Sequence, residues 1–313
     1  MADDWGIASS FLPLRRVLMH RPRRGLERIT PASLGYWNFT RAVMPERFLA
    51  EYDELIATLV AEGVEPVLLG DVLGSDDEAL AYLDQHPNAT YTRDSAFLLA
   101  RGAVLMSMAL PSRAGEPPVV ARALARLGVP ILGRIEPPAL LEGGGVQLVG
   151  DRSLLVALCD RANQAAVEQL RRLLLGPHLD EIVSVAMPPG TIHIDGDLVV
   201  IDRDLAVGYV AALGYRPATV YRAGAEPLQV PLLNWLAERC VELIELDRAE
   251  RDAMGANLVA IAPRAVVGYA AADAVGARVA DRDGRFLGVA DTELIQGNGG
   301  PHCMTLELLR SAT

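Results

Sequence analysis

The sequence predicts an α/β fold built from one repeated unit of hairpin, helix and strand. The main observation is four pairs of short aliphatic runs, each joined by a tight polar turn, as in β-hairpins that are covered on both faces. The pairs are Ala96–Leu99 with Val104–Met106, Val146–Val149 with Leu154–Val156, Leu198–Ile201 with Leu205–Val207, and Leu258–Ile261 with Ala265–Val267. Because the hairpins recur roughly every 50 to 60 residues, the sequence favours a propeller-like or solenoid arrangement over a doubly wound sheet.

Segments between the hairpins show the apolar spacing of helices, and a glycine follows each of them. Glycine ends helices well because it adopts positive φ without strain. The predicted helices are Pro45–Glu62, Pro118–Leu127 and Arg161–Leu175, followed by Gly63, Gly128 and Gly176. Two of them lead into apolar strands, Val64–Leu69 and Val129–Leu132. The terminal strands, at Arg15–His20 and around Cys303, are expected to form the remaining unit together and to close the ring.

Composition places the chain among compact, acidic proteins. Of its 313 residues, 51% are hydrophobic, which suffices for a sizeable core, and the net charge of -11 argues against nucleic acid or an anionic membrane as partner. A signal-peptide pattern and an apolar run of membrane-spanning length are both lacking, so we expect a cytoplasmic protein. The three cysteines fit neither a disulfide framework nor a metal site, and Cys159 and Cys240 are expected in the core.

The third cysteine differs because a glycine-rich loop leads to it. Residues 297–303 read Gly-Asn-Gly-Gly-Pro-His-Cys, and glycines let a ligand approach the backbone closely. A lone cysteine is usually a small buried hydrophobe, but three polar clusters can complete a site around this thiol. Asp94, Glu142 and His193 each lie just ahead of a predicted hairpin, and Asp195 shares one side of an extended chain with His193. In a ring of repeated units these positions would face one central channel.

Five motifs, in their order along the chain, resemble the guanidine-modifying pentein superfamily and arginine deiminase in particular. The motifs are Leu14–Pro22, Asn88–Asp94, Glu142–Gly144, His193–Asp195 and Gly299–Met304. The resemblance implies five ββαβ-type units around a pseudo-fivefold axis, with the active site in the central channel. It also implies a single catalytic domain over residues 1–313. The long helical insertion of arginine deiminases is absent, since only Gly70–Gln85 lies at that place.

The resemblance further implies a role for each matching residue. Cys303 would be the nucleophile, His193 the general acid and then the general base, and Glu142 the group that orients His193. Asp94 and Asp195 would hold the guanidinium nitrogens. The positions that match substrate-binding residues are Asn88, Arg113, Arg161 and Asn298. This chemistry requires no cofactor and no metal.

Two positions next to these motifs depart from the family pattern. Gly145 stands where the family usually has an aspartate, and Asn298 stands where it usually has an arginine that contacts the substrate. Both changes concern the substrate rather than the reaction. A guanidine compound that is larger than arginine, or of a different shape, therefore stays open as the substrate.

The first hypothesis for function is a hydrolase that converts a small cationic guanidino compound, arginine or an arginine-like amino acid, to a ureido product and ammonia. An amidinotransferase that passes the amidino group to an amine is the alternative, because it needs the same residues. A non-catalytic binding protein of the same fold is a third hypothesis, which the complete set of thiol, imidazole and carboxylates disfavours. A homodimer stays open as the state of assembly.

Overall fold

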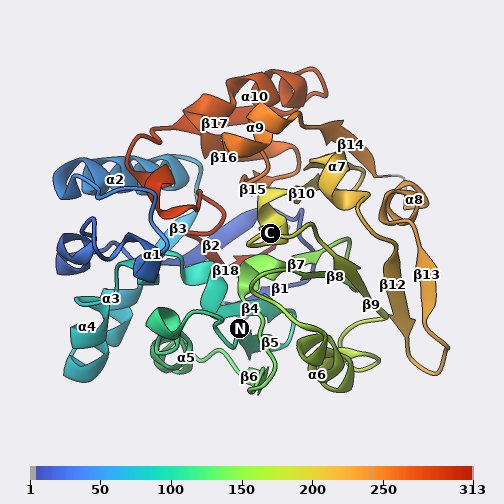
Figure 1. Cartoon of the computed structure of the whole chain (residues 1–313), viewed down its shortest axis with the longest axis horizontal. Helices are drawn as coiled ribbons and strands as arrows, with labels where there is room; N and C mark the ends of the chain where they lie inside the picture. Colours follow the sequence, from blue (N-terminus) through green and yellow to red (C-terminus); the bar gives the residue numbers. More distant parts are fainter. Residues whose placement is uncertain (1–4, 240, 312–313) are drawn as a thin grey trace.

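The computed structural model describes residues 5–239 and 241–311 of the chain. The strands of this described part form five sheets, and helices lie on the outside of the molecule (Figure 1). Every sheet contains an antiparallel pair of strands, one of which also pairs in parallel with a third strand, and in four of the sheets this antiparallel pair is a hairpin. The α/β class and the four hairpins predicted from the sequence are confirmed.

The strand triplets share one order of pairing. They are β4 (Ala96–Leu99), β5 (Gly102–Leu105) and β6 (Ile131–Arg134); β7 (Val146–Leu148), β8 (Ser153–Leu158) and β9 (Glu181–Ala186); β10 (Leu198–Asp202), β11 (Leu205–Gly208) and β14 (Glu242–Glu245); β15 (Val259–Ala262), β16 (Ala265–Tyr269) and β17 (Arg285–Val289); β18 (Leu306–Arg310), β2 (Leu14–Met19) and β3 (Glu65–Leu68). The last triplet joins both ends of the chain, with β1 (Gly6–Ile7) beside β18. Cys303 lies in the turn before β18 rather than inside a strand, because Pro301 cannot donate to a strand ladder.

The three predicted helices are confirmed, with small shifts at their ends. They are α2 (Pro45–Ala61), α5 (Glu116–Arg126) and α6 (Gln164–Leu174). α6 begins later than predicted because Asn163 caps it, its side chain accepting a hydrogen bond from the N–H of Ala166. Gly63 and Gly128 have φ values of 78° and 72°, as helix ends require. None of the helices in the described part of the chain combines the length and the hydropathy needed to cross a membrane.

The largest departure from the predicted repeat lies between β11 and β14. This segment contains α7 (Val210–Leu213), β12 (Ala218–Arg222), β13 (Leu228–Val230) and α8 (Leu232–Ala237). β12 pairs with β9, so the sheet of β7, β8 and β9 gains two strands. Cys240, expected in the core, lies outside the described residues, and Cys159 is half-buried. The remaining α-helices of the described chain are α1 (Leu34–Trp37), α3 (Leu69–Leu73), α4 (Asp77–Leu83), α9 (Arg248–Asp252) and α10 (Asp273–Ala280).

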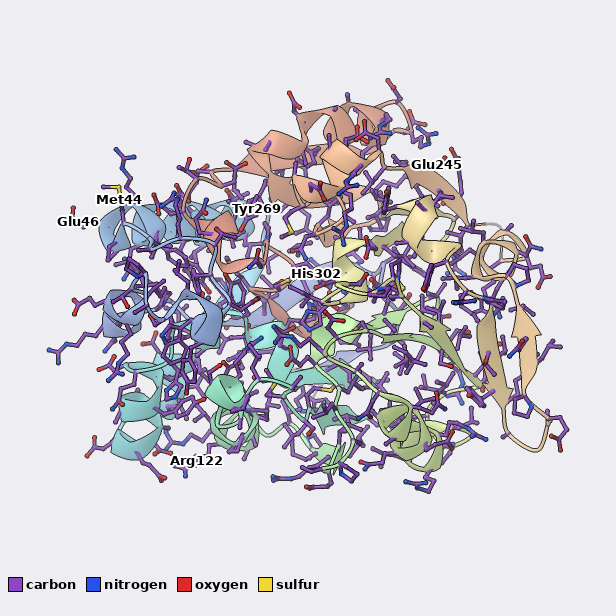
Figure 2. All side chains as sticks on the ribbon, in the orientation of Figure 1. Met44, Glu46, Arg122, Glu245, Tyr269 and His302 are labelled. Atoms are coloured by element: carbon purple, nitrogen blue, oxygen red, sulfur yellow. The ribbon has the colours of Figure 1, made fainter. Side chains whose placement is uncertain are left out.

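The sheets carry polar residues toward the middle of the molecule. Their hairpin strands are apolar and buried, and burial of apolar surface at about 25 cal/mol per Å² is the main stabilising contribution. A short 3-10 helix, labelled η, precedes the first strand of three hairpins. These helices are η3 (Thr92–Ser95) before β4, η5 (Gly143–Gly145) before β7 and η6 (Ile194–Gly196) before β10. Figure 2 shows His302 near the centre, whereas Glu46, Arg122 and Glu245 lie at the periphery. Polar side chains from these segments therefore meet inside the fold.

Candidate active site

Four of the five predicted catalytic residues, Asp94, Glu142, His193 and Cys303, line one cavity. Asp94, Glu142 and His193 come from the segments ahead of three different hairpins and Cys303 from the segment ahead of β18, which is why residues far apart in the sequence meet here. Asp195 reaches the same thiol, with its Oδ2 atom 3.3 Å from Sγ of Cys303. All five residues are more than nine-tenths buried. The structure therefore brings together every residue that the sequence assigned to catalysis.

Glu142 is fully buried and holds the imidazole of His193. Its Oε2 lies 2.9 Å from Nε2 of His193, and its Oε1 accepts a hydrogen bond of 2.9 Å from the N–H of Ala109. Burial alone would raise the pKa of Glu142, but the bond to His193 and the charge of Arg113 lower it to about 2. Burial alone would lower the pKa of His193, but Asp94 and Glu142 raise it to about 9. His193 is therefore protonated at neutral pH and can act as a general acid.

Asp94 is paired with a cation of the protein itself. Its Oδ2 lies 2.7 Å from Nη1 of Arg113, and its Oδ1 accepts a hydrogen bond of 3.2 Å from the N–H of Gly144. Arg113 also forms a two-pronged ion pair with Glu116, at 2.9 and 2.7 Å, and donates to the carbonyl of Tyr91. Burial raises the pKa of Glu116 to about 7. Every side-chain nitrogen of Arg113 thus has an acceptor in the protein, and this guanidinium fixes the position of Asp94.

Asp195 has a different partner, the imidazole of His302. Nδ1 of His302 lies 2.9 Å from Oδ2 of Asp195. Burial and the charge of Arg93 lower the pKa of His302, so its ring is neutral at physiological pH. Burial would raise the pKa of Asp195, but the hydrogen bond from His302 and the nearby positive charges, among them those of His193 and Arg93, together outweigh burial, and the pKa is lower than usual. Asp195 is therefore ionised, and its neutral partner leaves the negative charge in place beside the thiol.

The thiol of Cys303 lies between Asp195 and Asn257. Its Sγ accepts a hydrogen bond of 3.1 Å from Nδ2 of Asn257 and donates to Asp195. Through Oδ1, Asn257 also accepts hydrogen bonds from the N–H groups of His302 and Cys303, at 3.1 and 3.4 Å. Burial and the charges of Asp195 and Asp94 raise the pKa of this thiol well above its usual range. A bound cation that neutralised these carboxylates would favour the thiolate.

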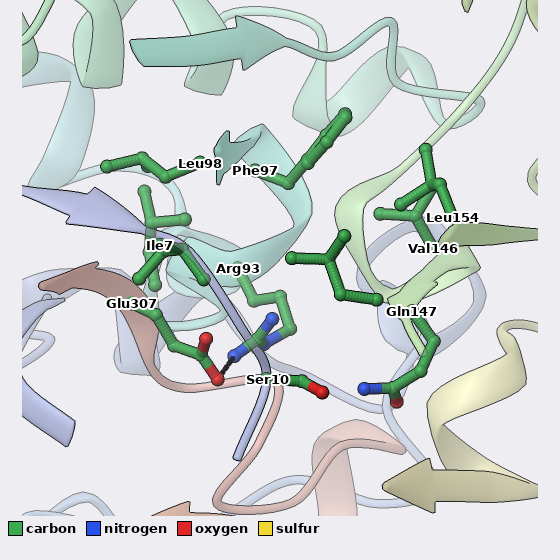
Figure 3. A pocket seen from close by; sticks show the side chains of 11 residues that line it. Ile7, Ser10, Arg93, Phe97, Leu98, Val146, Gln147, Leu154 and Glu307 are labelled. Atoms are coloured by element: carbon green, nitrogen blue, oxygen red, sulfur yellow. Dashed lines mark hydrogen bonds and ion pairs between the residues drawn. The ribbon is translucent and has the colours of Figure 1, made fainter. Parts of the chain in front are cut away.

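Arg93, the chain neighbour of Asp94, fastens the loop that carries Cys303. Its N–H donates to the carbonyl of Cys303 at 3.2 Å, and its Nε donates to the carbonyl of His302 at 2.9 Å. Figure 3 shows its guanidinium against the carboxylate of Glu307, at 2.9 Å, in a separate cavity that Phe97 and Gln147 also line. Arg93 therefore holds the loop of Cys303 from outside the cavity that Asp94 and Glu142 line.

Two predicted substrate-binding residues keep free hydrogen-bonding atoms in the cavity. Arg161 donates to Glu142 at 3.4 Å, and its other donors have no partner among the described residues. Asn88 donates to the carbonyl of Trp37 at 2.8 Å, while its Oδ1 lacks a partner within the described chain. Arg113 lines the same cavity but has no such free donor. The cavity therefore offers a ligand the free donors of Arg161, the acceptor Oδ1 of Asn88 and the hydroxyl of Tyr91, which also lacks a partner within the described chain.

The two positions that depart from the family pattern differ in their relation to the site. Asn298 lines this cavity and an adjoining one, adopts a left-handed φ of 57°, and donates to the carbonyl of Asn38 at 2.8 Å. Gly145 lies in η5, packed near Leu141, and lines neither cavity. Only the change at Asn298 therefore alters a wall that a substrate can contact.

Asp94, Glu142 and His193 present ligand atoms within 4.8 Å of one another, which is close enough to hold a metal ion. The guanidinium groups of Arg113 and Arg161 already lie against these carboxylates, at 2.7 to 3.6 Å. A divalent cation would have to sit beside those two charges, at a cost in electrostatic free energy. The arrangement suits an organic cation that shares hydrogen bonds better than it suits a metal ion.

Comparison with known proteins identifies the family. The family model for arginine deiminase matches residues 72–310. The chain belongs to the arginine deiminase family. Arginine deiminases of Rhodococcus opacus (strain B4) and Mycobacterium tuberculosis (strain ATCC 25618 / H37Rv) are 25% and 24% identical to it, over 97% and 99% of both chains. The first alignment runs over 393 positions although this chain has 313 residues, so that relative carries insertions that this family member lacks.

Solved structures show that this arginine deiminase family member has the pentein fold. A dimethylarginine dimethylaminohydrolase from Pseudomonas aeruginosa, in complex with citrulline, matches with a TM-score of 0.71 at 18% identity, over 94% of this chain and 99% of the other. The N-terminal domain of ArgZ, an arginine dihydrolase of cyanobacteria, matches with a TM-score of 0.73 at 15% identity, over 95% and 98%. Identities this low establish the shared fold and leave the substrate to be argued from the site.

Sequence reasoning missed three residues that support the site of this arginine deiminase family member. Asn257, which binds the thiol, lies just ahead of the β15 hairpin, the place that Asp94 has ahead of β4. The repeated placing of polar residues ahead of hairpins could have predicted Asn257 as a site residue. Glu116 holds Arg113 from three residues away, but such spacing is common on solvated helices and carries no signal. No motif set His302 apart from its neighbours in the glycine-rich loop.

Proposed function

We propose that this family member hydrolyses a guanidino compound, arginine or an arginine-like amino acid, to a ureido product and ammonia. The observation that carries the proposal is the contact between the Cys303 thiol and Asp195, in a buried site where His193 is protonated. A nucleophile, a carboxylate and a general acid are what attack on a guanidinium cation requires. The shared pairing of the five sheets supports the further proposal of one domain, a pseudo-symmetric propeller-like ring with this site in its channel.

In the proposed complex, Asp94 and Asp195 bind the nitrogens of the planar guanidinium through charge-assisted hydrogen bonds. Arg113 compensates the charge of Asp94, whereas neutral His302 does not compensate that of Asp195. Asp195 therefore supplies more of the attraction for the cation. The bound cation also offsets the two negative charges that keep the thiol protonated. In this way the substrate favours the thiolate that attacks it.

The proposed reaction has two steps. The thiolate of Cys303, its proton lost to solvent, bonds to the guanidinium carbon, His193 protonates the departing nitrogen, and the C–N bond breaks to leave an S-alkylthiouronium. His193, now neutral, takes a proton from water, the hydroxide adds to the same carbon, and the C–S bond breaks to restore the thiolate and release the ureido product. The surplus proton ends on ammonia as ammonium. A structure of the N-terminal domain of ArgZ with a covalently bound reaction intermediate supports this route.

The amino-acid end of the substrate is proposed to lie against Arg161 and Asn88. The free donors of Arg161 suit a carboxylate, and the unpartnered Oδ1 of Asn88 suits an ammonium group, because it is an acceptor. Arg113 is assigned to a different task from the one that the resemblance implied. Because its nitrogens are engaged with Glu116 and Asp94, it positions Asp94 rather than holding the substrate carboxylate.

The test is incubation of the purified protein with a panel of guanidines, including arginine, arginine derivatives and agmatine, while ammonia and the ureido product are measured. We expect equal amounts of ammonia and ureido product from an arginine-type substrate, and neither from the Cys303→Ser variant. A new guanidine formed on an added amine, without ammonia from hydrolysis, would establish the amidinotransferase instead. The absence of both products over the whole panel would contradict the proposal.

A further inference from the structure

Two cavities meet at Cys303, the first lined by Asp94 and the second by Asp195. The cavity that Figure 3 shows has no lining residue in common with either of them. We call it the Arg93 cavity, because Arg93 lines it and also holds the loop of Cys303. Its polar groups take no part in the proposed reaction, so they call for a different explanation.

Two uncharged side chains that line the Arg93 cavity are buried without a hydrogen-bond partner. Ser10 and Gln147 are each 7% exposed, and neither the hydroxyl of Ser10 nor Oε1 of Gln147 has a partner in the described part of the chain. In Figure 3 the two groups are turned toward each other, below the guanidinium of Arg93. Because buried polar groups in native structures nearly always have a partner, these two indicate an occupant of the cavity.

The charged groups at the Arg93 cavity carry an excess of positive charge. Glu307 is the only carboxylate of the described residues that forms an ion pair with Arg93 or Arg310, and it pairs with each at 2.9 Å. Burial alone would raise the pKa of Glu307, but the charges of Arg310 and Arg93 lower it well below its usual range, so Glu307 is ionised. Asp195 is bound to His302 instead and pairs with neither arginine. Two buried guanidinium groups therefore share one carboxylate.

Arg93 has one donor left for a ligand. Its Nε donates to the carbonyl of His302 and its Nη2 to Glu307, whereas Nη1 has no partner among the described residues. The hydroxyl of Ser10 and the amide nitrogen of Gln147 can donate into the same cavity. A charged N–H group beside two neutral donors is an arrangement that suits an anion.

The size of the Arg93 cavity limits the choice of anion. Its volume is about 30 Å³, which leaves room for one or two particles the size of a water molecule. An organic anion is therefore too large, whereas a monatomic anion fits. Water could satisfy the hydrogen bonds of Ser10 and Gln147, but it could not balance the charge of the second buried arginine.

We propose that the Arg93 cavity binds one monatomic anion of the halide class, such as chloride. The anion accepts hydrogen bonds from Nη1 of Arg93, from the hydroxyl of Ser10 and from the amide nitrogen of Gln147. It also balances the positive charge that Glu307 leaves uncompensated, and so it stabilises the folded protein. This inference does not depend on the proposed reaction.

Bromide is the probe for direct detection, because it replaces chloride and scatters X-rays anomalously. Crystals of the unmodified protein soaked in sodium bromide should show an anomalous peak in the Arg93 cavity, within hydrogen-bonding reach of Nη1 of Arg93. A water molecule without anomalous signal at this place would overturn the inference. Bromide peaks at the protein surface alone would mean an adventitious ion only, and they would overturn it as well.

The thermal midpoint tests binding in solution. Sodium chloride is compared with sodium gluconate at equal ionic strength, because gluconate is too large for the cavity while the screening of charges stays the same. The midpoint difference between the two salts should be larger by about 2 °C or more in the unmodified protein than in Gln147→Leu, which removes one ligand of the anion. Gln229→Leu, in the exposed strand β13, is the matched control and should keep the full difference.

The comparison between variants also removes general effects of the two salts on stability, since these act equally on all three proteins. An equal midpoint difference in the unmodified protein and in Gln147→Leu would overturn the inference, because chloride would then act elsewhere. The bromide peak decides the matter even if Gln147→Leu fails to fold.

Discussion

The two cavities that meet at Cys303 are built in opposite ways. In the first, Asp94 is paired with the permanent cation of Arg113, and glycines pack against Tyr91 with no room for a side chain. In the second, Asp195 is paired with a neutral imidazole, and a Cβ atom at Gly196 in the wall would meet no other atom within 4 Å. The comparison teaches that a direct ion pair and tight packing go together on one side, whereas a neutral hydrogen-bond partner and free space go together on the other.

This difference separates two tasks. The first cavity can fix the orientation of a planar cation, because its carboxylate cannot move without leaving the buried Arg113 charge poorly paired. The second can attract the cation and control the thiol, because Asp195 is the largest electrostatic cause of the raised pKa of Cys303. Stability should therefore depend on the first side and reactivity on the second.

The largest expected effect is at the residue that both sides share. Cys303→Ser should lower kcat/KM by roughly four orders of magnitude or more, because serine lacks the nucleophile on which both steps depend. Binding of substrate should remain, since Asp94 and Asp195 are unchanged. Steady-state kinetics and equilibrium binding check this expectation, with Cys159→Ser as the control outside both cavities. Substantial turnover by Cys303→Ser would contradict the covalent mechanism.

Matched substitutions of the two carboxylates compare the sides directly. Asp195→Asn and Asp94→Asn should each lower kcat/KM by roughly a hundredfold, through the loss of a charge-assisted contact. Asp94→Asn should in addition lower the free energy of unfolding by about 2 kcal/mol, because the buried Arg113 loses one of its charged partners and keeps Glu116. Denaturant unfolding of both variants measures this difference.

The Cys303 thiol should respond to these variants in the reverse order. Asp195→Asn removes the nearest negative charge, so the pKa of the thiol should fall and alkylation of the free protein by iodoacetamide should become faster. Asp94→Asn should have a smaller effect on this rate. Equal stability and equal alkylation rates in the two variants would show that the two sides of the site do not divide stability and reactivity between them.

Arg161→Ala sharpens the assignment of the first cavity. Loss of a charged contact to a carboxylate costs about 1.5–3 kcal/mol, or roughly tenfold to a hundredfold in kcat/KM. The loss should appear with arginine and be small with agmatine, which has no carboxylate. Arg113→Ala should impair both substrates, because Arg113 positions Asp94. If agmatine suffers as much as arginine in Arg161→Ala, or is the better substrate of the unmodified protein, the carboxylate assignment is wrong.

The pH dependence tests the general acid. Because the pKa of His193 is raised to about 9, the proton donor is present below pH 9 and is lost as pH rises through that value. We expect turnover of arginine to fall about tenfold per pH unit above pH 9. S-methyl-L-thiocitrulline, whose thiolate leaves without a proton, is the control and should not show this fall in the first step. A decline already near pH 6.5 would show that His193 is not stabilised in its charged form.

The same shift makes a prediction for stability. A raised pKa in the folded state means that His193 stabilises the fold fully below its unfolded pKa of 6.5, and that this contribution disappears as pH rises toward 9. His193→Gln should therefore reduce the fall in thermal midpoint between pH 6 and about 9.5. An unchanged slope in this variant would contradict the assignment.

The sequence predicted those parts of the fold and the site that a pattern of neighbouring residues marks. Alternating turns and aliphatic runs mark hairpins such as β4 with β5, and the predicted catalytic residues Asp94, Glu142 and His193 lie directly ahead of such hairpins. The engagement of Arg113 by Asp94 and Glu116 could not be predicted, because it depends on burial that three segments create together. β12 and β13 were missed because both strands are short and their sequences, Ala-Thr-Val-Tyr-Arg and Leu-Gln-Val, contain no aliphatic run. The second cavity is a space that no side chain fills, and no residue pattern in the sequence predicts such a space.

The most direct test of the central claim is detection of the covalent intermediate. His193→Ala should react with S-methyl-L-thiocitrulline, because methanethiolate departs without a general acid, but it should not hydrolyse the adduct, because the base is missing. Mass spectrometry after an acid quench should then show one S-alkylthiouronium per chain, on the peptide that contains Cys303. Release of methanethiol with an unmodified Cys303, or an adduct on Cys159 instead, would contradict the account.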